Sequence, residues 1–409
     1  MLLKMAWRNL WRSRRRTLIT AFTVAFGVLL SVSFTASGDY SYTEVINTSA
    51  RMGTGHLTVE APGYNDNPTL DKRVPGAGEI RARVLELPGA TDAVVRIMGQ
   101  AMFSSAAKSL GGIFIALDPA GESPGINFFL DSIEEGELFE GTGGRGAVIG
   151  SKMAEKLNIG IGRKLVYTAT DATGEIVGEV ARVEAVFRTG VDEVDSTFVL
   201  LPIDRVRETL KYTPDEASLV AVFIDDQRNA RAFKDVLEKE IGPGEYEVLT
   251  WDITQPDMAG FVTIDRGFNY LFQLLIGLLI AAGILNTILM SVLERRREFG
   301  VMMAVGTSPA RLTGLVLMES IMIGLLGLMI GTVLTIPWYA YMSTTGILFE
   351  SLEGANIGMV PMEPVIKFRL YFESAVAILA GIFALTLVAG LYPAIKASRV
   401  APVESLKYG

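Results

Sequence analysis

Cysteine is absent from the sequence, and histidine occurs only once, at His56. A chain without cysteine can form no disulfide and can offer no thiolate as a nucleophile or a metal ligand. A single histidine also excludes a histidine-based metal centre or catalytic triad within one chain. His56 lies in the strand-like segment GHLTVEA, where we expect it to have a structural role.

A phosphate-binding loop of the form G-x-x-x-x-G-K-[ST] is also missing, so the chain is not expected to hydrolyse ATP by that route. The glycines of Gly160-Ile161-Gly162 follow a helix-like segment rather than a strand, and we interpret them as a turn. Carboxylates are abundant, but no two of them stand out as an acid–base couple. The sequence therefore predicts a protein that is not itself an enzyme, with no metal, cofactor or nucleic acid as its ligand.

Long apolar runs, in contrast, are prominent. Half of the residues are hydrophobic, and the mean hydropathy is +0.36. Four runs, at residues 18–36, 270–292, 312–338 and 372–392, are each long enough to cross a hydrocarbon core of roughly 30 Å as a helix. Buried helices of a large soluble protein are the alternative, but such helices rarely stay uncharged for this length. The first run also resembles a cleaved signal peptide, although its length favours an uncleaved helix.

Charge is distributed unevenly along the chain, although the net charge is −8. Residues 1–16 contain six basic side chains and no acidic one, residues 294–311 contain four arginines and two glutamates, and residues 393–409 contain three basic side chains and one acidic. Residues 38–267 contain 22 basic and 37 acidic side chains. Short basic segments mark the cytoplasmic side of membrane proteins. We therefore expect both termini inside, and residues 38–267 and 339–371 outside.

These patterns predict an α-helical membrane protein with four transmembrane helices and a large α/β (α+β) periplasmic domain inserted between helices 1 and 2. The predicted parts are a cytoplasmic amphipathic basic helix (1–16), transmembrane helix 1 (17–37), the periplasmic domain (38–267), transmembrane helix 2 (268–293), a cytoplasmic loop with a short helix (294–311), transmembrane helix 3 (312–338), a short periplasmic loop (339–371), transmembrane helix 4 (372–392) and a cytoplasmic tail (393–409). In the first of these, Leu3, Trp7, Leu10 and Trp11 recur at helical spacing, as in helices that lie in the headgroup layer.

The external domain alternates strand-like and helix-like segments. Strands are expected at 56–61, 93–98, 113–117, 164–170, 177–187, 196–201, 217–224 and 246–249, and helices at 78–87, 151–157, 204–210 and 227–240. Glycine- and proline-rich breaks at 118–125 and 141–146 suggest an inserted subdomain near 112–195.

The segment ERRREFGVMMAVGTSPAR, residues 294–311, predicts a short amphipathic helix between two breaks. Gly306 suits a left-handed helix end, Ser308 suits the cap of the next helix, and Pro309 suits its first turn. The apolar residues of the short helix cannot span a membrane, so we expect a partner to cover them. Packing against the chain's own N-terminal helix is the alternative.

The third apolar run contains a carboxylate and a pair of glycines. Gly327 and Gly331 have the G-x-x-x-G spacing that allows two helices to approach closely. Glu319 lies well inside the run, where an isolated charge is costly. We expect it to pair with a cytoplasmic arginine rather than to transfer protons.

The residues of the short segment also carry a family resemblance. ERRREFGVMMAVGTSPAR resembles the E-R-x-x-E-I-G-x-L-x-A-x-G loop of the type VII ABC transporter permeases, with Phe299 where isoleucine is usual. The C-terminal AGLYPAIKASRVAPVESLKYG, the N-terminal AWRNLWRSRRRT and LMESIMIGLLGLMIG resemble other segments of these permeases. Within this superfamily, GTGHLTVEAPGY resembles a segment that follows the first span in the lipoprotein-releasing permeases.

The resemblance implies a dimeric permease of the bacterial inner membrane, either a homodimer or paired with a sister chain. It also implies two copies of a separate ABC ATPase that binds ATP and Mg²⁺, and a permease that carries the closure of this ATPase to the outer domain by mechanotransmission. The short cytoplasmic helix would rest on that ATPase. The residues assigned to this coupling are Glu294, Arg297, Glu298, Phe299, Gly300, Val301, Met302, Met303, Val305 and Gly306.

In the lipoprotein-releasing relatives, an acylated protein enters between spans 1 and 2 of opposing subunits and passes to a periplasmic carrier. The corresponding lipid- or lipoprotein-binding candidates in this sequence, which recur at helical spacing, are Phe22, Phe26, Leu30, Phe34, Phe268, Phe272, Leu275 and Leu279. Ordinary contact with membrane lipid or with neighbouring helices is the alternative. The resemblance leaves three functions open: lipoprotein release, efflux of periplasmic substrates to an exit duct, and regulation of a cell-wall enzyme.

Overall fold

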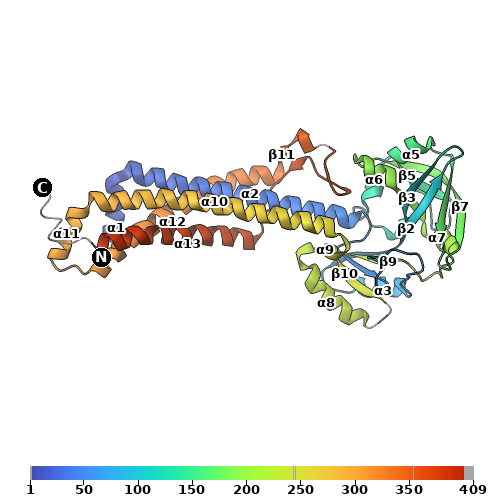
Figure 1. Ribbon diagram of the computed structural model, residues 1–409, viewed down its shortest axis with the longest axis horizontal. Helices are drawn as coiled ribbons and strands as arrows, with labels where there is room; N and C mark the ends of the chain where they lie inside the picture. Colours follow the sequence, from blue (N-terminus) through green and yellow to red (C-terminus); the bar gives the residue numbers. More distant parts are fainter. Residues whose placement is uncertain (1, 243, 245, 353, 400–409) are drawn as a thin grey trace. The chain divides into compact units, whose positions relative to one another are not determined.

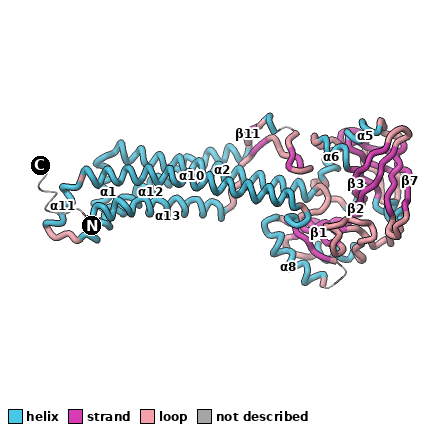
Figure 2. The backbone as a smooth tube through the Cα atoms, in the orientation of Figure 1, coloured by secondary structure: helices cyan, strands magenta, loops and turns pink. Residues whose placement is uncertain are grey.

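The computed structural model describes residues 2–242, 244, 246–352 and 354–399 (Figure 1). They form two compact units. Of the described residues, the helical unit contains 2–41, 264–348 and 365–399, and the α/β unit contains those within 42–263 and 349–364. Figure 2 shows that the first is built almost entirely of helices and that the large sheet belongs to the second. Residues 400–409 of the predicted cytoplasmic tail lie outside the described residues.

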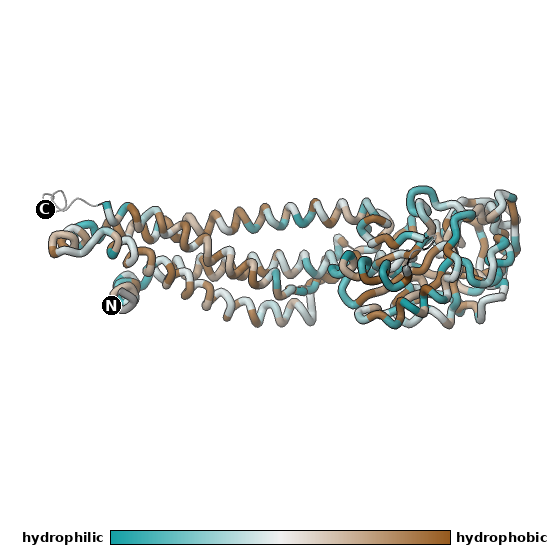
Figure 3. Tube along the Cα trace, turned by 90° about the horizontal axis from the view of Figure 1, so that it is seen from below, coloured by the Kyte–Doolittle hydropathy of each residue, from teal (hydrophilic) through white to brown (hydrophobic). Residues whose placement is uncertain are grey.

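Long apolar helices dominate the helical unit. Among the described residues, four helices have the length and composition needed to cross a membrane, and Figure 3 shows the hydrophobic residues along them. The elements of this unit are α1 (Leu2–Leu10), η1 (Trp11–Ser13), α2 (Arg14–Arg51), α10 (Pro256–Glu294), α11 (Arg296–Ala304), α12 (Pro309–Thr344), β11 (Ile347–Leu348), β14 (Val365–Ile366) and α13 (Phe372–Ser398), with α2 and α10 extending into the α/β unit.

The first and second apolar helices continue well beyond the predicted spans. Helix α2 reaches Arg51 rather than ending near residue 37, and α10 begins at Pro256 rather than near residue 268. The outer end of α2 stays helical because Val45 and Ile46 are buried in an apolar cluster of the α/β unit. An amphipathic helix can therefore continue from lipid into a protein interior without a break.

Glycines hold α12 close to its neighbours. A β-carbon at Gly327 would lie 2.5 Å from Cβ of Val24, and one at Gly331 would lie 2.8 Å from Cβ of Val28, both on α2. Gly324 faces Thr386 of α13 in the same way. The G-x-x-x-G spacing of α12 is therefore the contact surface for α2.

Leu10 is buried inside the protein, whereas its spacing in the sequence predicts a side chain in the headgroup layer. It is 5% exposed and belongs to the apolar core of the helical unit, whereas Trp7 on the same helix is 51% exposed. Helix α1 therefore has one face packed on its own chain, mainly along α12.

Ten described strands form one mixed sheet in the α/β unit, in the order β10-β1-β9-β2-β3-β8-β5-β7-β4, with β6 paired to β2 and β7. The strands are β1 (Leu57–Glu60), β2 (Ala90–Ser104), β3 (Ser109–Leu117), β4 (Ile133–Gly136), β5 (Gly146–Gly150), β6 (Lys164–Thr170), β7 (Ile176–Phe187), β8 (Phe198–Pro202), β9 (Leu219–Ile224) and β10 (Glu247–Thr250). The helices are α3 (Ala77–Leu85), η2 (Pro119–Gly121), α4 (Phe128–Asp131), α5 (Ser151–Leu157), α6 (Asp192–Thr197), α7 (Ile203–Leu210), η3 (Gln227–Asn229), α8 (Ala230–Ile241), α9 (Trp251–Thr254) and η4 (Glu350–Leu352), and β12 (Asn356–Ile357) pairs with β13 (Val360–Pro361).

Strand β2 joins two parts of this sheet. Its first half pairs with β9 through Arg96, and its second half pairs with β3 from Ile97 onward. The part on the β3 side of β2 contains residues 112–195, the segment interpreted as an inserted subdomain. It includes β4 and β5, which were not predicted as strands. The fold is thus four long apolar helices and an α/β domain between the first and the later ones.

Candidate functional site

Helix α11 is separated from its neighbours by two breaks. Gly306 has a φ of 101°, a left-handed conformation that glycine adopts without strain. Its N–H donates to the carbonyl of Met303 at 3.0 Å, and the N–H of Thr307 donates to that of Met302 at 3.0 Å, which ends the helix. Ser308 occupies the N-cap of α12 and Pro309 lies in its first turn, as the sequence predicts, although the Ser308 side chain makes no capping hydrogen bond.

Two faces of α11 differ in exposure. Phe299 is fully buried and Gly300 is also buried, so the expectation that Phe299 is exposed to a partner is wrong. The ring lies in the core cluster of the helical unit, which also contains Leu10 and Leu312, because this face of the short helix packs inward. Val301 and Val305 are exposed, and Val305 is 84% exposed.

The remaining coupling candidates are either half-buried or exposed. Met302 and Met303 are half-buried against the same core cluster, whereas Glu294, Arg297 and Gly306 are exposed. The apolar surface that α11 presents outward is therefore smaller than the sequence suggested and is centred on Val301 and Val305.

Ion pairs connect this segment to the N-terminal region. Arg12 Nη1 lies 2.7 Å from Glu298 Oε1, and Arg16 Nη1 lies 2.9 Å from Glu294 Oε2. Hydrogen bonds from Arg295 and Arg12 lower the pKa of the Glu298 carboxyl. The two pairs are largely exposed, so each adds little stability by itself, but together they join η1 and the start of α2 to both sides of Arg295.

Glu319 is buried and has two donors. Its Oε1 accepts a hydrogen bond from Nη1 of Arg295 at 2.9 Å and from Nδ2 of Asn9 at 2.8 Å. Arg295 thus supplies the cytoplasmic arginine expected for this carboxylate, and it also lies over the ring of Phe299, 5.0 Å from the centroid. Asn9 was missed because nothing in the sequence indicates which donor on another helix faces a buried carboxylate.

The lipid-binding candidates lie on α2 and α10. Seven of the eight are exposed, and only Leu30 is half-buried. The rings of Phe34 and Phe272 stack with their centroids 5.5 Å apart and their planes at 3°. Nearby, Gln273 Nε2 donates to Thr35 Oγ1 at 2.6 Å. The two rows of residues therefore adjoin within one chain, where they form an exposed aromatic surface.

Two family models match this chain. The MacB-like periplasmic core domain matches residues 17–240, and the C-terminal domain of the FtsX-like permeases matches residues 270–402. The chain belongs to the FtsX/MacB family of ABC transporter permeases. The permease is thus a multi-pass inner membrane protein with a periplasmic domain, and its α/β unit forms that domain.

Relatives of the permease carry different functional names. An uncharacterised ABC transporter permease of Methanocaldococcus jannaschii is 24% identical over 98% of this chain and 96% of that protein. The lipoprotein-releasing system transmembrane protein LolC of Neisseria meningitidis is 23% identical over 89% of each chain. The macrolide export ATP-binding/permease protein MacB of Photorhabdus laumondii is 24% identical over 98% of this chain but only 60% of that protein.

Proposed function

We propose that this permease extracts lipoproteins from the inner membrane and passes them to a periplasmic carrier, with ATP hydrolysed on a separate subunit. The observation that carries the proposal is the exposed aromatic surface of α2 and α10, where Phe34 stacks on Phe272. The similarity to lipoprotein-releasing proteins over most of the chain supports the same function.

Acyl chains bind by burying apolar area, which contributes about 0.8 kcal/mol per buried methylene. Exposed phenylalanine and leucine side chains on two helices, which meet where Phe34 stacks on Phe272, provide that area at the membrane. In our proposal, a second permease subunit faces this surface and closes an entrance for the acylated end of the cargo.

The energy enters through α11. An ABC ATPase, present in two copies, contacts the exposed side chains of Val301 and Val305. The buried Phe299 and the pairs around Arg295 then carry its movement to α1, α2 and α12. The permease contributes no catalytic residue to ATP hydrolysis in this scheme.

A second candidate function is efflux of periplasmic substrates toward an exit duct. The match to the MacB-like core domain and the similarity to a macrolide exporter favour it. Regulation of a cell-wall enzyme is a third possibility, which the match to the FtsX-like domain supports. Both alternatives leave the aromatic surface of α2 and α10 as ordinary lipid contact.

Site-specific photocrosslinking tests the proposal. A photoreactive residue replaces Phe26 or Phe272 in the full-length permease, which is incubated in membranes with its ATPase and a labelled triacylated lipoprotein. We expect crosslinks to the lipoprotein at both positions. Val376 on α13, which is similarly exposed, serves as the matched control. Labelling at Val376 equal to that at Phe26 and Phe272, or labelling at none of the three, contradicts lipoprotein entry at α2 and α10.

A further inference from the structure

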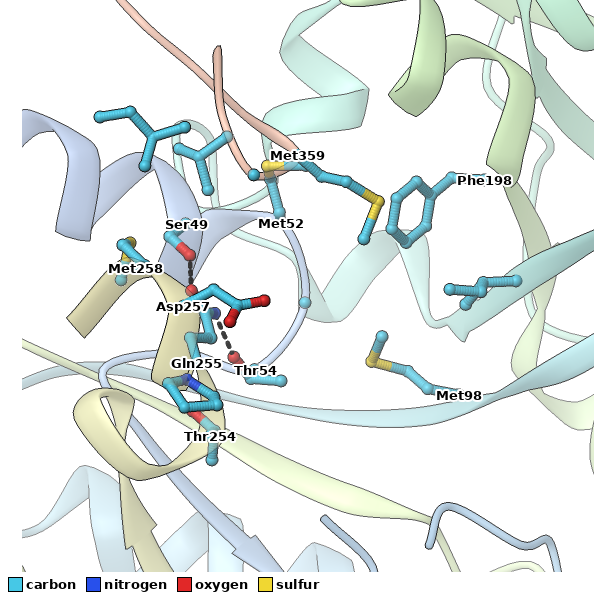
Figure 4. A pocket seen from close by; sticks show the side chains of 16 residues that line it. Ser49, Met52, Thr54, Met98, Phe198, Thr254, Gln255, Asp257, Met258 and Met359 are labelled. Carbon is cyan, nitrogen blue, oxygen red and sulfur yellow. Dashed lines mark hydrogen bonds between the residues drawn. The ribbon is translucent and has the colours of Figure 1, made fainter. Parts of the chain in front are cut away.

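The periplasmic domain contains a small apolar pocket, which shares no residue with the aromatic surface of α2 and α10. Its volume is about 340 Å³, which is within the range of small-molecule sites. The walls come from the end of α2, the start of α10, strands β2, β3 and β8, and the hairpin of β12 and β13 (Figure 4). All of these residues belong to the α/β unit.

Four of the 16 residues that line the pocket are methionines (Figure 4). They are Met52, Met98, Met258 and Met359, and Ile113 and Phe198 add branched and aromatic surface. Methionine is unbranched and adapts its shape to the group it contacts. Such a lining suits a flexible hydrocarbon chain better than a rigid ring, because the side chains can rearrange along its length.

A short chain of hydrogen bonds forms the polar part of the pocket. Ser49 Oγ donates to Gln255 Oε1, and Gln255 Nε2 donates to Thr54 Oγ1 at 3.0 Å. Figure 4 shows these bonds beside Asp257. The three uncharged side chains offer hydroxyl and amide groups to a carbonyl, but no cation is among the residues that line the pocket.

Asp257 adds a negative charge to this polar edge. The residue is exposed and lines the pocket, so a carboxylate ligand meets a like charge there. A free fatty acid is therefore disfavoured relative to an acyl chain in an ester or amide linkage, which has a carbonyl but no charge.

We propose that this pocket binds one acyl chain in ester or amide linkage. Two sources share that chemistry, the acylated end of a lipoprotein and a membrane phospholipid. The inference that a lipoprotein supplies the acyl chain rests on the proposed function. The inference that the pocket binds an acyl chain does not.

Photoreactive acyl probes test this site in the full-length permease in lipid nanodiscs. A dodecanoyl chain with a diazirine is amide-linked to a short neutral peptide, and labelled residues are mapped by mass spectrometry. We expect saturable labelling of peptides containing Met98 or Met359. Met98→Trp fills the pocket and should reduce labelling about tenfold, as expected when roughly two methylenes lose their contacts. Met102→Trp, at an exposed position on the same strand, should leave labelling unchanged.

The charge of Asp257 gives a second measurement that does not depend on filling the pocket. The free dodecanoate probe should label the wild-type pocket weakly, and Asp257→Asn should increase this labelling while leaving the amide-linked probe unaffected. Equal labelling by both probes in the wild type, or no labelling of pocket residues by either, overturns the proposal.

A diazirine phospholipid in the nanodisc distinguishes the two sources. If the lipopeptide labels the pocket in the presence of excess phospholipid, the lipoprotein is supported as the source. If only the phospholipid labels the pocket, the lipoprotein is overturned as the source. The proposed function fails separately, through absent crosslinks at Phe26 and Phe272. Crosslinks there without labelling of the pocket refute only the pocket.

Discussion

Arg295 donates a hydrogen bond to Glu319 at 2.9 Å, and both side chains are mostly buried, at 14% and 6% exposure. Arg295 follows the end of α10, and Glu319 lies within α12. The same carboxylate also accepts from Asn9 of α1. Helices α1 and α12 and the turn between α10 and α11 therefore meet at this carboxylate.

Removal of the carboxylate should destabilise the helical unit. In Glu319→Ala, Arg295 loses its buried partner and keeps only the partly exposed Glu298, and the amide of Asn9 loses its acceptor. Buried donors left unsatisfied in this way typically cost about 1–3 kcal/mol. We expect a clear decrease in the thermal unfolding temperature of the detergent-solubilised permease. Arg12→Gln breaks only an exposed pair and should change stability by less than about 1 kcal/mol. Similar unfolding temperatures for the two variants would show that the buried pair contributes little.

The exposed residues of α11 should affect ATPase binding rather than folding. Val301→Asp and Val305→Asp place charges on an apolar surface that a partner would cover, so co-purification of the ATPase should fall sharply while membrane insertion remains normal. Phe299→Ala should instead destabilise the permease by about 3–5 kcal/mol, since it removes a fully buried ring. Undiminished ATPase recovery with both aspartate variants would refute docking at this surface.

The contact of α12 with α2 should be sensitive to a single methyl group. Gly327→Ala places a carbon 2.5 Å from Cβ of Val24, so the helices must separate, at a cost of about 1–3 kcal/mol. Gly314→Ala, on the same helix, meets no atom within 4 Å and serves as the control. Thermal unfolding of both variants measures the difference, and a decrease that is no larger for Gly327→Ala would show that the helices adjust freely.

Two buried groups should give the periplasmic domain opposing pH dependences. His56 accepts the N–H of Ile224 and pairs with Asn47, and burial lowers its pKa from 6.5 to about 4. Burial raises the pKa of Glu60 from 4.5 to about 7. The unfolded chain binds the extra proton at His56 between pH 4 and 6.5, so this group reduces stability as the pH falls. The folded chain binds the extra proton at Glu60 between pH 4.5 and 7, so this group reduces stability as the pH rises.

The two contributions, about 1–3 kcal/mol each, largely cancel in the wild type. His56→Gln should therefore lose stability as the pH rises from 4.5 to 7, and Glu60→Gln should lose stability as it falls from 6.5 to 4, each relative to the wild type. Thermal unfolding of the full chain across this range measures both slopes. Parallel curves for the three proteins would mean that neither group titrates differently on folding.

The sequence predicted secondary structure best where local patterns decide it. The expected helix at 151–157 and the expected strand at 164–170 coincide with α5 and β6. Strand β5 was missed because the five residues GAVIG are a short run between glycines and have no period to measure. The outward end of α2 was missed because Asp39 and Glu44 indicate departure from lipid, but not that the helix continues into a protein core.

Tertiary contacts explain the remaining differences at the candidate site. The spacing of Phe299 and the valines of α11 is compatible with inward packing or outward docking, and only the position of α1 and α12 decides that Phe299 is buried. The cluster of Arg295, Glu319 and Asn9 depends on residues 310 positions apart in the sequence. Polar pairs at such separations have no local pattern, so the sequence predicts an arginine partner but does not identify its second donor.

The attachment of α11 also has a mechanical consequence. The packed ring of Phe299 resists compression, because a close-packed core has no space into which it can move. The ion pairs of Arg12 with Glu298 and Arg16 with Glu294 resist separation only weakly, because solvent reaches them. The junction therefore bears compression better than tension. A helix held in this way transmits a push better than a pull.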